Sequence, residues 1–270
     1  MKLTVQGVDA YAYTGGKTFD PALPCLAFVH GALHDHSVWT LLARWFAHHG
    51  HGVLAVDLPG HGRSAGPALD SVEHCADWLL ALLDAAGVQQ AAVAGHSMGS
   101  LIGLETAARA PKRITRLVML GTAYPMKVSD ALFAAAREQP LQAIAMVNNF
   151  SISSTAAKPS FPGPGAWLHA GNQVLMERQV AQARRDQGVD LFTHDFAVCD
   201  RYANGLQAAA QVQCPAHFIL GARDQMASPK ASRELGTALK ARVVSLPGVG
   251  HHLMAEAPDA VLAATRTALA

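Results

Sequence analysis

The chain has 270 residues, of which half are hydrophobic and 15% charged, and its formal net charge is +1. This composition suits one α/β domain with an insertion and excludes binding to nucleic acid or an anionic membrane through a field of positive charge. No apolar run approaches the ~18 residues of a transmembrane helix, and the first residues lack the apolar core of a signal peptide. The cysteines form no Cys-x-x-Cys pair, so we expect a reduced, cytoplasmic setting. They are Cys25, Cys75, Cys199 and Cys214.

Short β-rich runs alternate with longer amphipathic runs, which is typical of an α/β fold with a mostly parallel sheet and helices on both faces. The opening segments predict a β-hairpin at one edge of the sheet, over residues 2–6 and 9–13. Six further strands are expected, over residues 25–30, 52–57, 91–95, 116–120, 216–220 and 242–246. Helices are expected between them, over residues 38–48, 71–86 and 97–109.

The alternation stops over residues 123–213, which hold helical patterns and no strand pattern. The helices expected there cover residues 129–138, 141–150, 167–185 and 196–211. A segment rich in proline and glycine, residues 158–165, is expected to be non-helical. We therefore predict a core domain of residues 1–122 and 214–270 that carries a helical domain of residues 123–213.

A candidate nucleophile lies between a predicted strand and a predicted helix, in Gly95-His96-Ser97-Met98-Gly99. The pattern G-x-S-x-G at such a turn holds the serine in a strained conformation with its hydroxyl exposed, and glycines avoid collision with the neighbouring strand and helix. The helix N-terminus behind Ser97 also favours developing negative charge. The pattern occurs by chance as an ordinary strand-to-helix turn, but its position here favours a catalytic serine.

Acyl transfer needs two backbone donors for the oxygen that becomes negative in the transition state. We expect one from Met98, directly after the nucleophile, and one from Ala32, in the loop after an earlier strand. Gly31 is expected to allow a sharp turn there and to bring the amide close to the substrate. His30 is interpreted as a brace for this loop through hydrogen bonds.

The acid and base candidates follow the last two predicted strands. Asp224 lies after residues 216–220, and His251 and His252 lie after residues 242–246. A serine hydroxyl needs an adjacent imidazole as base, and a buried carboxylate must hold that imidazole in one tautomer. Spacing alone does not choose between the two histidines.

A second acid, Asp57, also follows a predicted strand. It opens a glycine-rich segment that includes Arg63. We interpret this segment as a structural loop in which Asp57 and Arg63 make local polar contacts, which leaves Asp224 as the favoured acid.

From Leu26 onward the chain resembles the α/β-hydrolase superfamily, above all its cofactor-free esterase, haloperoxidase-like and carbon–carbon hydrolase branch. The matching motifs are His30-Gly31, residues 57–64, the Ser97 turn, Gly221-x-x-Asp224, and Gly250-His251 followed by Glu256-x-Pro258. The resemblance implies a helical lid over the site, formed by the inserted residues.

The family pattern also assigns roles near the C-terminus. Its catalytic histidine follows the glycine and stands five positions before Glu-x-Pro, which implies His251 as the base. His252 is then a neighbour in the loop, and Glu256 is a residue at a helix start.

Two departures narrow the resemblance. Ser97 at the turn excludes the haloalkane dehalogenases and epoxide hydrolases of this fold, which carry aspartate there. The run Ala32-Leu33-His34-Asp35 lacks the longer glycine-proline stretch frequent in carbon–carbon hydrolases, which weakens that assignment without excluding it.

Apolar residues of the insertion and its surroundings either line an acyl pocket or form the core of the inserted helices. Our pocket candidates are Leu33, Trp39, Phe161, Trp167 and Met226. The histidine clusters at 34–36 and 48–51 lack the spacing of ligands on one helical face, so we expect no metal site and no cofactor.

The sequence thus predicts a serine hydrolase that forms an acyl-enzyme on a small or medium, largely apolar carboxylic ester or thioester. Activity is expected to rise with pH as His251 loses its proton. The alternatives are hydrolysis of a lactone, amide or carbon–carbon bond with the same residues, or a ligand-binding or signalling protein on this fold. We expect a small acyl substrate and water as the only partners, with a homodimer left open.

Overall fold

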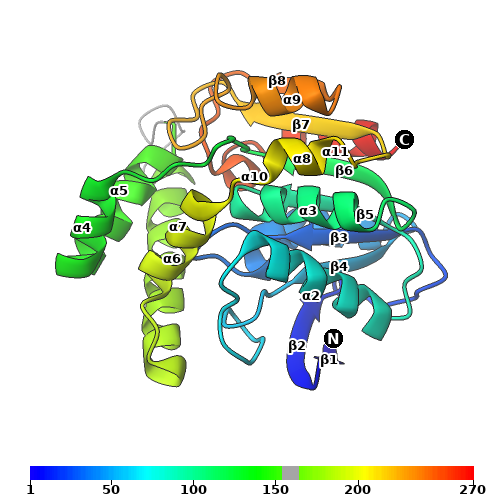
Figure 1. Ribbon diagram of the computed structural model, residues 1–270, viewed down its shortest axis with the longest axis horizontal. Coiled ribbons are helices and arrows are strands. Elements are labelled where there is room, and N and C mark those ends of the chain that lie inside the picture. The colour runs from blue at the N-terminus through cyan, green and yellow to red at the C-terminus, as the bar shows by residue number, and fades with distance from the viewer. Residues whose placement is uncertain (154–163) are drawn as a thin grey trace.

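The computed structural model describes residues 1–153 and 164–270, with only the backbone of residues 164–166. The described residues form an eight-stranded sheet in the order β1-β2-β4-β3-β5-β6-β7-β8, seen nearly edge-on in Figure 1. The strands are β1 (Lys2–Val5), β2 (Val8–Tyr13), β3 (Cys25–Val29), β4 (Gly52–Val56), β5 (Ala91–His96), β6 (Ile114–Leu120), β7 (Ala216–Gly221) and β8 (Arg242–Leu246). The hairpin β1–β2 joins β4 antiparallel, and the remaining pairs are parallel, which confirms the predicted class.

Helices cover both faces of the sheet (Figure 1). One face packs against α1 (Thr40–Ala47) and α11 (Pro258–Leu269), and the other against α2 (Val72–Ala85), α3 (Met98–Arg109), α8 (Gly205–Ala209) and α9 (Arg233–Ala238). The strands β3 to β5 are buried along their whole length because neither face meets water. This explains why these strands read as continuous apolar runs and not as alternating patterns.

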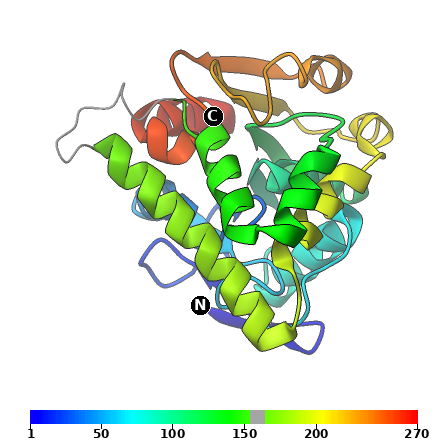
Figure 2. The same cartoon turned by 90° about the vertical axis from the view of Figure 1, so that its left-hand side faces the viewer.

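The inserted helices lie between β6 and β7 and gather at one end of the sheet, on the left of Figure 1. They are α4 (Asp130–Glu138), α5 (Pro140–Ser151), α6 (Pro164–Gln187) and α7 (Leu191–Arg201). In Figure 2 the long helix α6 runs obliquely from the upper left to the lower right, beside α5. They share an apolar cluster that includes Ile144, Met176 and the stacked rings of Phe192 and Phe196, 4.6 Å apart.

Two expectations about this insertion are wrong. The single helix expected over residues 196–211 is divided into α7 and α8, because Tyr202 and Asn204 turn toward the buried carboxylate of Glu105 at 2.9 and 2.6 Å. Residues 164 and 165, expected to be non-helical, begin α6, where a proline at the first position suits the missing N–H. Residues 158–163 lie outside the described residues. The division into two domains stays a prediction.

Serine and aspartate side chains mark the starts of several helices. Ser71, Ser129 and Asp190 each accept a hydrogen bond from the backbone N–H three residues later. Such caps satisfy donors that the first helical turn leaves free. Ser71 and Ser129 thereby fix the starts of α2 and α4 within one residue of the expected ones, whereas α7 begins five residues before its expected start.

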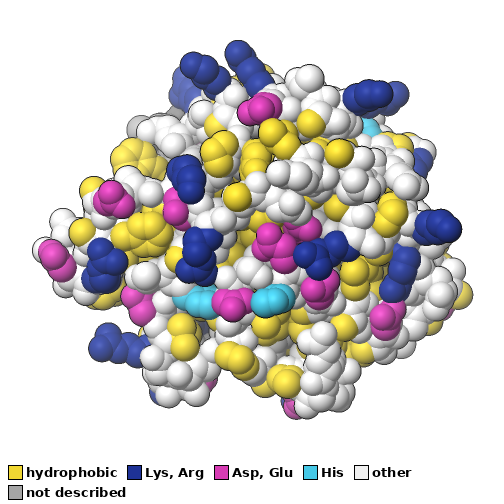
Figure 3. All heavy atoms as spheres, in the orientation of Figure 1, with side chains coloured by type: hydrophobic (Ala, Val, Ile, Leu, Met, Phe, Trp, Pro, Cys, Tyr) yellow, Lys and Arg dark blue, Asp and Glu magenta, His cyan; other side chains and the backbone are white. Residues whose placement is uncertain are grey.

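Charges of both signs are interspersed on the face shown in Figure 3. This distribution fits the formal net charge of +1. None of the described helices combines the length and the apolar character that crossing a bilayer requires.

Candidate active site

Ser97 occupies a strained turn between β5 and α3. Its φ and ψ are 53° and −120°, a conformation that side chains rarely adopt. A Cβ added to Gly95 would lie 2.0 Å from the carbonyl oxygen of Gly99, and one added to Gly99 would lie 2.3 Å from the carbonyl oxygen of Val29. The Ser97 N–H donates to the Leu120 carbonyl at 2.9 Å. The turn is therefore fixed by close backbone approaches that only glycine permits.

Asp224 and His251 meet beyond the ends of β7 and β8. The Nδ1 of His251 lies 2.8 Å from the Oδ2 of Asp224, and both side chains are buried. The other carboxylate oxygen accepts from the backbone N–H groups of Met226 and Ala227 at 2.8 and 2.7 Å. Asp224 therefore holds His251 with Nδ1 as the donor, which leaves its Nε2 free of a proton when the ring is neutral.

Ser97 and His251 line the same pocket. The described residues contain no hydrogen bond between the Ser97 Oγ and the His251 Nε2. Catalytic contacts of this kind often tighten only when substrate binds. The roles of nucleophile, base and acid stay predictions on this geometry.

The backbone of His251 is held from two sides. His96, next to the serine, donates its Nε2–H to the His251 carbonyl at 2.8 Å. Burial, with the nearby His251, lowers the pKa of His96 well below its ordinary value, so this ring stays neutral. From the insertion, the Ser151 carbonyl at the end of α5 accepts from the His251 N–H at 2.8 Å. The loop that carries His251 is thus fixed both by the Ser97 turn and by the inserted helices.

Glu256 and His252 also belong to this loop. Glu256, expected at a helix start, lies in the single turn of α10 (Leu253–Glu256), two residues before α11 begins. Its carboxylate accepts from the N–H groups of Gly250 at 3.0 Å and Ser153 at 3.1 Å. His252 is buried. Burial is the main cause that lowers its pKa to about 3, and the nearby His34 and His251 contribute to the same shift.

The expected oxyanion donors are the backbone N–H groups of Ala32 and Met98. Neither donates a hydrogen bond to another described residue. Gly31 lies close to the Ser97 turn, since an added Cβ would lie 3.1 Å from the Cβ of Ser97. The sharp turn begins at Gly31, whose carbonyl accepts from the His34 N–H at 3.3 Å, and its left-handed residue is Leu33, whose φ is +59°.

His30 braces the same loop, as its sequence position indicates. Its Nδ1 donates to the Gly31 carbonyl at 2.8 Å, and its Nε2 accepts from the Leu58 N–H at 3.1 Å. Burial and the nearby His61 lower its pKa to about 4. A neutral His30 therefore links the loop after β3 to the loop after β4.

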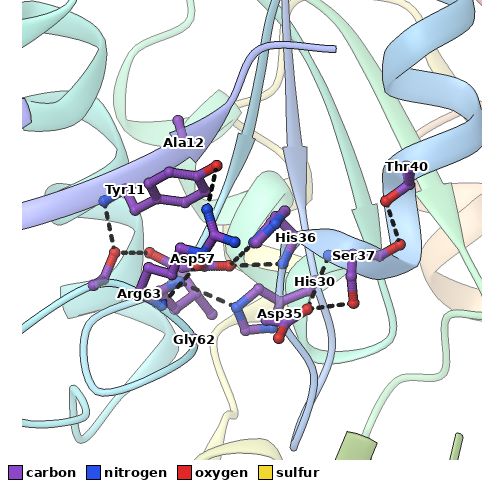
Figure 4. Close-up of polar contacts among 12 residues, drawn as sticks. Tyr11, Ala12, His30, Asp35, His36, Ser37, Thr40, Asp57, Gly62 and Arg63 are labelled. Atoms are coloured by element: carbon purple, nitrogen blue, oxygen red, sulfur yellow. Dashed lines mark hydrogen bonds and ion pairs between the residues drawn. The ribbon is translucent and has the colours of Figure 1, made fainter. Parts of the chain in front are cut away.

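Asp57, the alternative acid, is occupied by local contacts (Figure 4). Its Oδ1 accepts from the backbone N–H and from the Nδ1 of His36, both at 2.7 Å, and its Oδ2 accepts from the Arg63 N–H at 2.8 Å. The Arg63 guanidinium turns away to the Tyr11 hydroxyl at 3.1 Å. Asp57 thus organises the loop, and its carboxylate contacts the backbone N–H of Arg63 and not the Arg63 side chain.

Asp35, His36 and Asp57 bring possible metal-ligand atoms within 4.8 Å of one another. The Oδ1 of Asp35 accepts from the Ser37 N–H at 2.9 Å, and its Oδ2 accepts from Arg178 and Gln179 of α6 at 2.7 and 2.8 Å. The carboxylates of this cluster therefore accept hydrogen bonds from protein groups, and these bonds join two loops to α6.

The pocket beside Ser97 has a volume of about 310 Å³. Of the predicted pocket residues, Met226 lines it. Three are placed elsewhere: Leu33 lies in the apolar cluster of the insertion, Trp39 stacks on Phe28 at 4.8 Å, and Trp167 is 67% exposed on α6. Phe161 lies outside the described residues.

Further apolar residues of the wall come from the insertion, where the sequence left open whether apolar side chains line the pocket or form the core of the helices. They are Met126, Val128, Leu132, Val147, Phe150, Met176 and Phe196. Val147 and Phe150 share one face of α5 with Ser151, a helical spacing that is visible in the sequence. Which face of a helix meets the site is decided only by packing.

Comparison with known proteins decides the family. Residues 24–258 match the family described as alpha/beta hydrolase fold. The chain belongs to the α/β-hydrolase family. This confirms the resemblance inferred from the motifs.

Two curated relatives of this α/β hydrolase are informative. The dihydrolipoyllysine-residue acetyltransferase component of the acetoin cleaving system from Pseudomonas putida is 29% identical over 87% of this chain, which spans 60% of that protein. The putative carbamate hydrolase RutD from Pseudomonas savastanoi pv. phaseolicola is 28% identical over 74% of this chain and 76% of its own length. Of these two relatives, the second carries the name of a hydrolase.

The fold also has close structural counterparts. The enol-lactonase from Burkholderia xenovorans LB400 has a TM-score of 0.80 and 23% identity, with 100% of this chain and 99% of the other covered. At this identity the likeness shows the fold alone.

Proposed function

We propose that this α/β hydrolase is a serine hydrolase that forms an acyl-enzyme on a small or medium, largely apolar carboxylic ester or thioester. Ser97 is the nucleophile, His251 the base and Asp224 the acid behind it. The observation that carries the proposal is the buried 2.8 Å contact between His251 and Asp224 beside a pocket that Ser97 also lines.

In the first step the Ser97 Oγ attacks the substrate carbonyl carbon while the Nε2 of His251 takes its proton. The N–H groups of Ala32 and Met98 stabilise the oxyanion, and the positive end of α3 adds to this. The imidazolium then protonates the leaving group. A water molecule, deprotonated by His251, next attacks the acyl carbon and releases the acid and Ser97.

The pocket supports an uncharged and largely apolar acyl group. Its volume of about 310 Å³ is at the small end of the ~300–1,000 Å³ usual for ligand pockets. Lys127, a cation in the wall, donates to the Asp200 carbonyl at 2.7 Å and lies 3.6 Å from its carboxylate. With that charge paired, the site favours neutral substrates. We further propose that the inserted helices act as a lid, because α4 to α7 supply most of the apolar wall.

A second candidate is hydrolysis of a carbamate or amide by the same residues. The name of the relative RutD, putative carbamate hydrolase, favours it. Both reactions pass through attack of Ser97 on a carbonyl, so substrate profiling separates them. A panel of esters of graded acyl length, tested beside matched carbamates and amides, assigns the preferred leaving group.

Covalent labelling tests the mechanism. A fluorophosphonate probe should label the native chain at one serine and should fail to label Ser97→Ala. Ser37→Ala, which changes an exposed serine outside the pocket, is the matched control and should label normally. Labelling or ester hydrolysis by Ser97→Ala at the native rate contradicts the proposal. An unlabelled native chain favours a ligand-binding or signalling role.

A further inference from the structure

One buried carboxylate of the insertion touches the loop that carries the proposed oxyanion donor. Asp195, in α7, is 1% exposed. Its Oδ2 accepts from the Leu33 N–H at 2.9 Å and from the Nε2 of His61 at 2.9 Å. A single carboxylate oxygen therefore joins α7, the loop after β3 and the loop after β4.

The contact with Leu33 acts on a strained turn. The Leu33 φ of +59° and the 3.3 Å bond from the His34 N–H to the Gly31 carbonyl describe a tight turn with a left-handed third residue. Glycine is favoured at the third position of such a turn. Other residues there favour a different turn, in which the peptide between the second and third residues, the central peptide, is flipped. That central peptide joins Ala32 to Leu33. By accepting from the Leu33 N–H, Asp195 fixes this central peptide. It thereby holds in place the turn whose preceding peptide, between Gly31 and Ala32, carries the Ala32 N–H.

His61 requires a positive charge in this arrangement. Its Nδ1 lies 3.0 Å from the Pro59 carbonyl, and its Nε2 lies 2.9 Å from Asp195, so both ring nitrogens face acceptors. Only the doubly protonated ring donates to both. Burial opposes the charged form, but the charge and hydrogen bond of Asp195 outweigh it, so the pKa of His61 is raised.

Other titratable groups around the pair come from three elements. The His30 ring, 5.1 Å from that of His61, is neutral, with a pKa lowered to about 4 by burial. The Asp57 carboxylate further raises the pKa of His61 and so stabilises its positive charge. His194 lowers the pKa of Asp195 and so stabilises its negative charge. The pKa of Asp195 is lowered, since burial is outweighed by His61 and by the Leu33 N–H.

Glutamines of α6 hold the His61 loop against the insertion. Gln179 accepts from the Gly62 N–H at 2.9 Å, and Gln182 donates to the Gly62 carbonyl at 2.7 Å. Gln187 donates to the Gly60 carbonyl at 3.2 Å. These contacts dock α6 on the same loop but do not touch the oxyanion turn.

We propose that Asp195 is a positioning residue that presents the Ala32 N–H, and that it does so only while the insertion is docked and His61 carries its proton. The inference rests on the proposed function, because it concerns the oxyanion site of that reaction. It makes the inserted helices part of the catalytic geometry and not only a cover over the pocket. The reaction rate should then fall at alkaline pH, because a neutral His61 no longer donates to both the Pro59 carbonyl and the Asp195 carboxylate, which loosens the joint between the loop and α7.

The rate constant of fluorophosphonate labelling at Ser97, measured from mildly acidic to alkaline pH, tests this without knowledge of the substrate. Asp195→Ala should label about 10- to 100-fold more slowly at neutral pH, the effect of a misplaced catalytic group. His61→Gln keeps a donor toward Asp195 but does not titrate, so it should label within a few-fold of native and lose the alkaline fall. Gln187→Ala, which loosens only the α6 contact, should match the native chain.

The outcomes of these measurements separate the inference from the proposed function. Native-rate labelling of Asp195→Ala, or an unchanged alkaline fall in His61→Gln, overturns the inference while the serine mechanism stands. Should Asp195→Ala not fold, as circular dichroism would reveal, the pH profile of His61→Gln decides alone. Failure of the native chain to label at any pH contradicts the proposed function itself, which distinguishes the two.

Discussion

At the scale of single residues, Ser97 shows how backbone strain is placed where chemistry is proposed. A side chain in this φ/ψ region costs ~1–3 kcal/mol, and it persists only when surrounding contacts over-determine it. Here those contacts are the bond from the Ser97 N–H to Leu120 and the close backbone approaches at Gly95 and Gly99. The glycines of the motif are therefore required by packing.

Gly99→Ala should destabilise the fold, because its new Cβ would lie 2.3 Å from a backbone oxygen that cannot move aside. We expect a loss of at least ~1–3 kcal/mol in the free energy of unfolding, measured by urea denaturation. Gly171→Ala on α6 is the control: nothing lies within 4 Å of its added Cβ. That change should stabilise by ~0.5–1 kcal/mol. Equal effects of the two substitutions would refute the steric account.

Asp224 and Asp57 are both buried and both follow a strand, so their substitutions can be compared directly. Asp224→Asn should reduce kcat by about 10⁴-fold, because an amide no longer holds His251 in the required tautomer. Asp57→Asn loosens the loop contacts of His36 and Arg63, so it should lower stability more than kcat. Steady-state kinetics and thermal unfolding of both variants check this. A larger kcat loss in Asp57→Asn would reverse the assignment of the acid.

At the scale of elements, the inserted helices hold both loops of the candidate site. The Ser151 carbonyl of α5 accepts from the backbone of His251, and the Asp195 carboxylate of α7 accepts from Leu33. The insertion thus contributes fixed hydrogen-bond acceptors as well as apolar wall. Its docking is coupled to stability through the buried pair of His61 and Asp195.

This pair should give the fold a pH dependence of known sign. Because the pKa of His61 is raised in the folded state, its contribution is fully present below the ordinary histidine value of ~6.5 and is lost as pH rises through the raised value. Because the pKa of Asp195 is lowered, its contribution is present above ~3.9 and is lost as pH falls through the lowered value. Urea denaturation across pH should show a maximum between these limits.

Variants of the pair provide the check on that profile. Asp195→Ala leaves a buried charge unpaired and should cost ~3–5 kcal/mol near neutral pH. In His61→Gln the alkaline decline should flatten, since glutamine does not titrate. A His61→Gln profile parallel to the native one at alkaline pH would show that another group is responsible.

At the scale of the whole molecule, charge is balanced and dispersed. The formal net charge is +1, and the face in Figure 3 carries interspersed acidic and basic side chains. A surface of this kind does not steer ions toward a site. Together with the paired Lys127 in the pocket wall, it fits the encounter of a neutral substrate by diffusion alone.

Salt should therefore have little effect on turnover of a neutral ester. We expect kcat/KM to change by less than about twofold between low and high ionic strength, because screening removes no significant attraction. An anionic ester of the same acyl length serves as the comparison. A steep decrease of kcat/KM with salt for the anionic ester alone would reveal local steering near the pocket mouth.

Local pattern alone determined much of this protein. Strand runs, the glycines around Ser97, and the spacing of Gly250, His251 and Glu256 depend on neighbours in sequence, so the class, the strand positions and the candidate catalytic residues could be predicted from them. The structure brings His251 and Asp224 into a buried contact, and the catalytic roles of these residues stay predictions.

Only the tertiary structure decided how the insertion meets the core. Asp195 lies 162 residues from Leu33 and 134 from His61, and no periodicity or motif joins positions so distant. The break after α7 depends on the buried Glu105 of another helix, and Trp167 is exposed because α6 turns that face to solvent. Side chains that act across elements are selected by the packing of those elements, and this information is absent from any local stretch of the chain.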